Sequence, residues 1–323
     1  MANLDNIKSK IKGPAFSIIT PFTDGGEHVD LDALDEYVTF LYEGGAKVFY
    51  VMGYNSRFSI LSDEEILKVN ETVVKRIKSF NDPECVSIIA DPLHCSTDTS
   101  IKFAKHGEQI GADVISLIFR EKVYFNDQVY NHFKKVSENT SLGILIHEMP
   151  LNNGIPGRPP LVKWPLDLLD RIADLKNVIA IKEDTKNDDY TKLVIDTLKD
   201  RLQIITSGNG MKQWLTFAPR CHGWLSGAGG FNPSIEVDFY NHYLSGEMDK
   251  CQNILETVEF PFNEIKDKFG WHLGIKSAMD IMGVMSRVER MPLQQLPNES
   301  HNEIVKMMHD IGKNTEYFSG LVG

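Results

Sequence analysis

The chain has 323 residues, of which 42% are hydrophobic and 24% are charged, as in an ordinary globular protein. Its formal net charge of −11 argues against a protein that binds nucleic acid or an anionic membrane through its overall field. No segment reaches the roughly 18 uninterrupted apolar residues of a membrane-spanning helix, and the first residues lack the apolar core of a secretory signal. We therefore expect a cytoplasmic protein without a nucleic-acid or membrane partner.

The four cysteines are spread along the chain, without a Cys-x-x-Cys pair or a short Cys/His spacing. This distribution signals neither a zinc site nor a disulfide framework. We expect no metal site, and we expect the cysteines to be reduced: Cys85, Cys95, Cys221 and Cys251.

The dominant pattern along the chain is a short apolar run rich in β-branched residues, then a loop, then an amphipathic segment. That alternation is typical of βα units around a parallel sheet. A closed (β/α)8 TIM barrel needs eight such units, and this α/β fold is our prediction. The predicted strands are residues 15–20, 47–52, 86–90, 114–118, 143–147, 178–182, 202–206 and 223–226.

Helix signals lie between the predicted strands. An apolar stripe with helical spacing precedes Gly44 and Gly45, a pair that predicts a left-handed stop. Ser62 and Glu65 form a capping-box pattern, which predicts that a helix begins there. The segment 96–111 repeats this logic.

After residue 233 the strand signals disappear and only helical periodicity remains. Helices are predicted at residues 235–244, 248–268, 273–282 and 303–311. Such a group could cap the barrel or supply an oligomer surface. Because no Gly/Ser/Pro linker precedes it, we expect one domain, with the barrel in residues 1–245 and a C-terminal helical extension in residues 246–323.

Lys182 is the first candidate for chemistry, because the working residues of a βα barrel lie at the C-terminal ends of its strands. It ends an apolar run, where a charge is costly unless it is paired or functional. Burial lowers the pKa of an amine, and a neutral amine can attack a ketone to form a Schiff base. The alternative is a lysine that meets Glu183 or Asp184 at the surface.

His147 ends the neighbouring predicted strand. Adjacent strands lie about 4.8 Å apart, so side chains at matching strand ends can reach the same bound molecule. A histidine there could carry a proton to or from a Schiff-base intermediate. The alternative is a histidine that is hydrogen-bonded to a loop carbonyl.

Three turns after predicted strands could bind substrate. The turn at 53–57 is rich in backbone donors and hydroxyls, and successive N–H groups can hold a carboxylate. Arg57 could add a bidentate contact or could be a solvated surface charge. Glycine-rich turns at 207–210 and 227–230 follow the last two strands, where barrels can bind phosphate or a sugar-like tail.

Taken in order, these segments resemble the dihydrodipicolinate synthase / N-acetylneuraminate lyase family. The likeness spans most of the chain, and residues 181–182 match the Ile-Lys pair that carries the family's Schiff-base lysine. The other matching segments are residues 13–22, 29–32, 41–45, 61–65, 207–209, 223–227 and 275–278.

The resemblance implies a Schiff base on Lys182 and aldol-type chemistry on pyruvate or a pyruvate-containing substrate. It implies that no metal or organic cofactor takes part, because the covalent lysine imine with the substrate takes the place of a cofactor. It also implies homotetramers or homodimers built partly from the helical extension.

Three departures from the family pattern fall in the implied site. The family's Gly-Thr-Thr-Gly-Glu turn is Gly-Tyr-Asn-Ser-Arg at 53–57, which alters the hydroxyl pair that helps to hold the pyruvate carboxylate. His147 stands where the family has its proton-carrying tyrosine, so the shuttle is His147 or a phenol moved to Tyr54. Asn152 stands where synthases keep an arginine, which argues against the synthase reaction itself, although Arg158 or Arg57 could compensate.

Our leading hypothesis is a lyase or aldolase that acts on pyruvate or a 2-keto-3-deoxy acid through a lysine imine. The alternative is a barrel of the same family that binds a small 2-oxo acid without turnover, as a binding or regulatory protein. The predicted catalytic residues are Lys182, His147 and Tyr54, and the predicted substrate-binding residues are Thr20, Asn55, Ser56, Arg57, Ser207 and Gly227.

Overall fold

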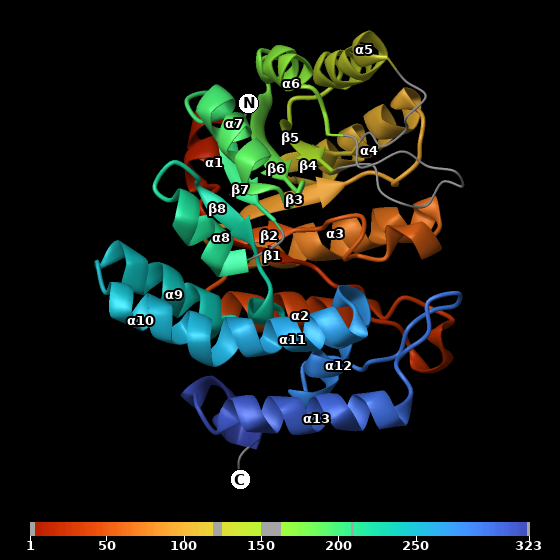
Figure 1. Cartoon of the computed structure of the whole chain (residues 1–323). Coiled ribbons are helices and arrows are strands. Elements are labelled where there is room, and N and C mark those ends of the chain that lie inside the picture. The colour runs from red at the N-terminus through yellow and green to blue at the C-terminus, as the bar shows by residue number, and fades with distance from the viewer. Residues whose placement is uncertain (1–3, 119–124, 150–162, 208–209, 322–323) are drawn as a thin grey trace, which may run out of the picture.

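The computed structural model describes residues 4–118, 125–149, 163–207 and 210–321. Parallel strands pair in sequence order, and β8 pairs with β1 to close the barrel (Figure 1). This confirms the predicted (β/α)8 fold. The strands are β1 (Gly13–Ser17), β2 (Val48–Tyr50), β3 (Val86–Ala90), β4 (Val114–Leu117), β5 (Gly143–Glu148), β6 (Val178–Glu183), β7 (Gln203–Thr206) and β8 (Gly223–Leu225).

Only β1 differs much from its prediction, because it lies earlier in the chain than residues 15–20. Gly13 already pairs with Gly223 of β8, although a glycine carries no strand signal. Beyond Ser17 the chain leaves the strand and forms the loop that carries Thr20. The apolar run therefore marked buried residues correctly but placed the strand too late.

Among the helices between the strands, the stop at Gly44 and Gly45, the start after Ser62 and the helix within 96–111 agree with the local signals. The Ser62 hydroxyl accepts from the Glu65 amide, and the Glu65 carboxylate accepts from the Ser62 amide, so the capping box is confirmed. Of the paired glycines, only Gly45 is left-handed, with φ 97°. These helices are α2 (Leu31–Glu43), α3 (Asp63–Ser79), α4 (Thr97–Ile110), α5 (Asn126–Ser137), α6 (Leu166–Ala173), α7 (Asp188–Leu198) and α8 (Gly210–Phe217), and short 3-10 turns are η1 (Asp24–Gly26), η2 (Phe58–Ile60) and η3 (Ala228–Gly230).

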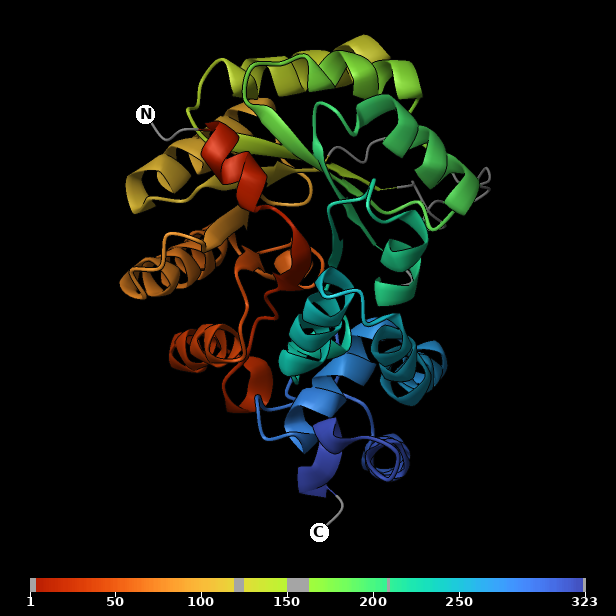
Figure 2. The same cartoon turned by 90° about the vertical axis from the view of Figure 1, so that its left-hand side faces the viewer.

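A short N-terminal helix that we did not predict, α1 (Leu4–Lys10), lies across one end of the barrel (Figure 2). Ile7 of α1 and the following Ile11 join the apolar cluster inside the barrel. Since strands begin at this end, α1 covers the end opposite to the site described below.

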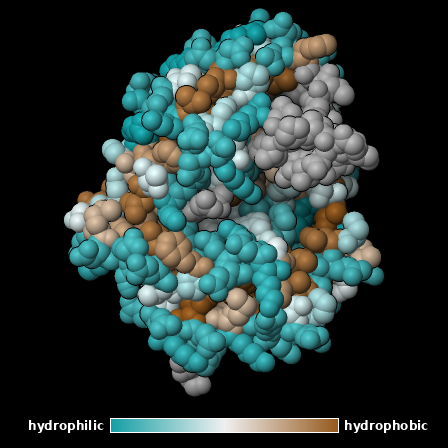
Figure 3. Space-filling model, in the orientation of Figure 1, coloured by the Kyte–Doolittle hydropathy of each residue, from teal (hydrophilic) through white to brown (hydrophobic). Residues whose placement is uncertain are grey.

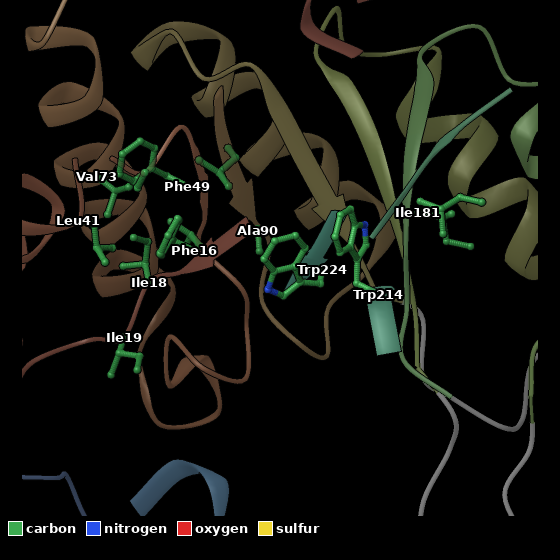
Figure 4. Close-up of a cluster of buried hydrophobic side chains, with 14 of the residues drawn as sticks. Phe16, Ile18, Ile19, Leu41, Phe49, Val73, Ala90, Ile181, Trp214 and Trp224 are labelled. Atoms are coloured by element: carbon green, nitrogen blue, oxygen red, sulfur yellow. The ribbon is translucent and has the colours of Figure 1, made fainter. Parts of the chain in front are cut away.

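Two apolar clusters hold the barrel together. The inner cluster fills the barrel with alternate strand residues such as Val48, Ile88 and Leu145. The outer cluster lies between strands and helices, where Phe16 and Phe49 meet Leu41 of α2 (Figure 4). Trp214 of α8 and Trp224 of β8 also belong to it, with ring centroids 4.7 Å apart.

The helical extension packs along one side of the barrel, next to α2 and α8 (Figure 1). The helix expected at 248–268 is interrupted by a π-helical turn, and the last long helix begins earlier than predicted. Within the described residues, no helix is long and apolar enough to span a membrane. The elements are α9 (Ser234–Leu244), α10 (Met248–Ile254), η4 (Leu255–Glu259), α11 (Phe260–Phe269), α12 (Trp271–Ile281), α13 (Asn298–Gly312) and η5 (Glu316–Leu321). On the face shown in Figure 3, hydrophilic residues predominate.

Candidate active site

Lys182 points into the barrel at the C-terminal end of β6. Ala180 belongs to the inner cluster and Ile181 to the outer one, so the next side chain in the alternation points inward. The Lys182 side chain is 0% exposed. Lys182 is therefore not the surface lysine of the alternative interpretation.

His147 of β5 is paired in register with Lys182, as the matching strand ends predicted. Its Nε2 atom lies 3.0 Å from the Lys182 Nζ atom. This imidazole is close enough to exchange a proton directly with the amine. The two residues that the sequence singled out for chemistry are thus brought together.

Asp184 is a third member of this cluster, although the sequence alone indicates it only as a surface partner of Lys182. Its Oδ2 atom lies 2.7 Å from Lys182 Nζ and 3.6 Å from His147 Nε2. The signal that could have found it is the strand alternation, which places a residue two positions after Lys182 on the same face.

The electrostatics of the cluster reflect burial and the close opposite charges. Burial lowers the pKa of the Lys182 amine, and Asp184 opposes that shift. Burial also acts to raise the pKa of Asp184, but Lys182 and His147 outweigh it and hold that pKa well below its usual range. The site therefore keeps one carboxylate charged beside an amine that loses its proton more readily than an exposed lysine.

A phenol that we did not predict as a site residue lies on the same inner face. Tyr50 of β2 hydrogen-bonds through its hydroxyl to Ser116 Oγ at 2.7 Å, and its ring centroid is 6.5 Å from that of His147. Burial raises the pKa of Tyr50, so this phenol stays neutral. Inward alternation within β2 was the available signal.

The turn after β2 brings together three of the predicted substrate-binding residues. Thr20 Oγ1 donates to the Ser56 carbonyl at 2.7 Å, and Ser56 Oγ donates to the carbonyl of Ile18 at 2.6 Å. Asn55 Nδ2 donates to Ser17 Oγ at 2.9 Å. Their side chains thus fix the turn to the end of β1, and the amides of Ser56 and Arg57 donate to the carbonyls of Met52 and Tyr54 within the turn. Tyr54, in the same turn, is half-buried and packs against both apolar clusters.

Arg57 has different partners from the expected substrate carboxylate, and it is not a solvated charge. It adopts a left-handed backbone with φ 62°, and its guanidinium is buried against Glu289 with a shortest N–O distance of 2.6 Å. It also donates to the carbonyls of Asn55 and His272. Arg57 therefore joins the β2 turn to the helical extension.

A second contact from the extension comes from Lys276 of α12. Its Nζ donates to the Thr20 carbonyl at 2.9 Å. Burial lowers the pKa of this amine to about 7. The extension is thus part of the wall that positions the β1 and β2 turns.

The glycine-rich turn after β8 is already occupied by a carboxylate of the protein. The amides of Gly227 and Gly229 donate to Glu236 Oε1 at 2.6 and 3.0 Å, and Trp224 Nε1 donates to Oε2 at 2.6 Å. The amides that a phosphate would need therefore hold Glu236 of α9, whereas a contact of this turn with a sugar-like tail stays a prediction. Gly227 lies on this closed turn.

The beginning of α8, after β7, is closed in the same way. Glu259 of the π-helical turn accepts from the amides of Met211 and Lys212 at 2.8 and 3.0 Å. Ser207 is buried at the end of β7, and the predicted turn residues 208–209 lie outside the described residues. Residues 150–162, with Pro150, Asn152 and Arg158, lie outside them too.

Two further acids, Glu148 of β5 and Glu183 of β6, lie next to the cluster but on the alternate face of their strands. Glu183 accepts from the hydroxyls of Thr185 and Thr191. Glu148 accepts from the Trp164 amide at 3.1 Å, and burial raises the pKa of Glu148 to about 8. Among the described residues, no group of three or more His, Cys, Asp or Glu side chains is arranged to hold a metal ion.

Comparison with known proteins agrees with this fold over most of the chain. A 4-hydroxy-tetrahydrodipicolinate synthase of Methanocaldococcus jannaschii is 27% identical over 305 residues, which cover 93% of this chain and 99% of that protein. The enzyme of the same name from Thermotoga petrophila is 25% identical over 288 residues, covering 87% of this chain and 92% of its own. The structure of a dihydrodipicolinate synthase from Bacteroides thetaiotaomicron has a TM-score of 0.81 at 17% identity, covering 93% of this chain and 98% of that one.

These relatives give no support to our argument from Asn152 against the synthase reaction. Residues 10–311 match the model of the dihydrodipicolinate synthetase family. Because that match covers nearly the whole chain, this protein belongs to the dihydrodipicolinate synthetase family of lyases.

Proposed function

We propose that this chain is a Schiff-base lyase or aldolase that acts on pyruvate or another small 2-oxo acid through Lys182. The observation that carries the proposal is a fully buried amine at the C-terminal end of a barrel strand, 3.0 Å from an imidazole. Family membership supports the same chemistry. An amine in this setting has little structural benefit, because its desolvation is costly.

The reaction begins when the Lys182 ammonium gives a proton to His147 Nε2, 3.0 Å away, and the lone pair of the neutral amine attacks the keto carbon. The carbonyl π electrons move to oxygen, a proton passes from the attacking nitrogen to that oxygen, and a carbinolamine forms. His147 then gives a proton to the departing hydroxyl, water leaves, and the nitrogen lone pair forms the C=N bond of an iminium. His147 ends this step neutral.

The iminium withdraws electrons from the adjacent carbon. That carbon can then lose a proton or break a carbon–carbon bond, and in either case the electron pair enters an enamine. Reprotonation, or addition to an aldehyde, and hydrolysis of the imine return the amine. The lysine imine supplies the electron sink, so we propose that no metal or organic cofactor takes part.

We place the carboxylate of the 2-oxo acid at the turn after β2. The side chains of Asn55 and Ser56 fix this turn, and the amides of Ser56 and Arg57 donate within it, so we assign the carboxylate contact to the Asn55 amide. Glu236 occupies amides of the turn after β8 and Glu259 those at the beginning of α8, which favours a substrate without a phosphate group. We further propose that the chain forms homodimers or homotetramers, as the family resemblance implies.

The test is borohydride reduction in the presence of pyruvate, followed by peptide mass spectrometry. We expect the mass of a reduced pyruvate adduct on Lys182 and none on Lys276, a buried lysine whose pKa is also lowered and which serves as internal control. Lys182→Met removes the adduct. If no 2-oxo acid gives an adduct on Lys182, the proposal fails.

The substrate is identified by a screen that measures release or consumption of pyruvate. It includes 2-keto-3-deoxy sugar acids, sialic acid, and pyruvate with a panel of aldehydes. If the protein forms an adduct and binds these compounds saturably but turns over none of them, the result selects the alternative, a binding or regulatory barrel.

A further inference from the structure

We propose that Asp184 is a further catalytic residue of this site, whose carboxylate is the counter-ion for the iminium on Lys182 and the partner that holds His147 for proton transfer. This inference rests on the proposed function. It assigns a role to a position outside the set that the sequence predicted.

The geometry places Asp184 against both reacting groups. Its Oδ2 atom is 2.7 Å from Lys182 Nζ and 3.6 Å from His147 Nε2, and its side chain is only 11% exposed. A charge-assisted hydrogen bond in a poorly solvated site is stronger than the same contact at the surface.

The neighbouring acid shows that this placement is specific to Asp184. Glu183 precedes it, yet its two carboxylate oxygens accept hydrogen bonds from Thr185 and Thr191 on the other face of β6. Strand alternation, not nearness in sequence, therefore decides which carboxylate meets the amine.

The charge balance of the reaction gives this carboxylate its function. The resting pair is an ammonium and a carboxylate. When the amine gives its proton to His147, the positive charge moves to the imidazolium, and when that proton leaves with water, the charge returns to Nζ as the iminium. At each step one positive charge lies within reach of Oδ2.

A structural ion pair is the competing explanation, and it predicts a different result. A buried pair gives little net stability compared with apolar residues of the same size. Replacing a purely structural Asp184 would change folding stability, and it would shift the pH at which trapping begins because the carboxylate acts on the Lys182 amine. It would leave the plateau yield of trapped imine in the folded protein unchanged.

The experiment compares Asp184→Asn and Asp184→Glu with the parent, with Asp189→Asn as a matched control at an exposed position of α7. Each protein is trapped with pyruvate and borohydride over a range of pH, and the yield at Lys182 is measured by mass. Other charged or titratable groups also act on the Lys182–Asp184 pair and remain in every variant: His147 and Glu148 of β5, Glu183 of β6, Lys186 after β6 and Tyr50 of β2.

We expect two opposite effects in Asp184→Asn. Without the carboxylate the amine loses its proton more easily. The rising limb, which is the pH range over which the yield of trapped adduct increases, therefore shifts to lower pH by about one unit or more. The plateau yield above this limb falls about tenfold or more, because the iminium has lost a charge-assisted partner. Asp184→Glu keeps the pH limb near that of the parent but lowers the plateau, and Asp189→Asn behaves as the parent.

The outcomes separate this inference from the proposed function. If the parent traps pyruvate and the plateau yield of Asp184→Asn matches that of the parent, the inference is overturned whether or not the limb has shifted, while the proposed function stands. If the parent gives no adduct, the proposed function itself fails. Circular dichroism shows whether each variant is folded. If Asp184→Asn is unfolded, Asp184→Glu becomes the test, and trapping by Asp184→Glu that equals the parent at all pH values overturns the inference.

Discussion

Replacing Arg57 by methionine should strongly destabilise the protein, because the change leaves a buried carboxylate without its partner. The side chains of Arg57 and Glu289 are 2% and 0% exposed, and their closest N–O distance is 2.6 Å. Arg57 Nε lies 3.1 and 3.2 Å from the two carboxylate oxygens. Methionine keeps much of the apolar stem, so the lost interaction is mainly electrostatic.

Removing one partner of a buried ion pair costs about 3–5 kcal/mol of unfolding free energy, because the remaining charge stays desolvated. Arg57→Met also removes the hydrogen bonds to the carbonyls of Asn55 and His272. We therefore expect a loss in that range for Arg57→Met and a similar one for Glu289→Met. The double variant should lose at least about 2 kcal/mol less than the sum, as coupled neighbours do.

The assay is reversible urea unfolding of the parent, both single variants and the double variant. Arg220→Met is the matched control, because Arg220 and Asp196 form a pair at 2.8 Å whose side chains are 41% and 46% exposed. That variant should lose no more than about 1 kcal/mol. Single-variant losses below about 1 kcal/mol at Arg57 and Glu289, with additive behaviour in the double variant, would refute the buried-pair reasoning.

Two further predictions concern proton transfer and pH. If His147 is the proton carrier, His147→Phe should lower turnover about 10²-fold or more without a change in fold; if the phenol is the carrier, Tyr54→Phe should do so. Steady-state kinetics of both variants distinguishes the two assignments. Full activity in both variants would contradict both. Burial raises the pKa of Glu148 from 4.5 to about 8, so the folded state holds a proton there that the unfolded state has lost, and the unfolding free energy falls as pH rises through that window. In Glu148→Gln this fall should be shallower, by at most about 1.4 kcal/mol for each pH unit. Urea unfolding at several pH values measures the slope, and an unchanged slope would show that Glu148 does not retain its proton in the folded protein.

Local sequence patterns determined the barrel and its central pair of residues. The alternation of apolar runs and amphipathic segments requires strands with helices between them, and the Ser62–Glu65 pattern fixes a helix start through hydrogen bonds within one turn. Lys182 stands out because it is a charge at the end of an apolar strand. His147 follows from it, since equal strand positions in a parallel sheet are neighbours.

The tertiary structure decided which distant groups share the same space. Arg57 and Glu289 are 232 positions apart, and only the packing of the helical extension against the β2 turn joins them. Glu236 accepts from the amides of the glycine-rich turn after β8, and Glu259 accepts from the first amides of α8; neither partner could be assigned from the sequence. Asp184 became a site residue because the closed barrel turns it inward. Short-range periodicity sets the face on which a side chain lies, whereas the groups that meet it there depend on how elements far apart in the chain pack together.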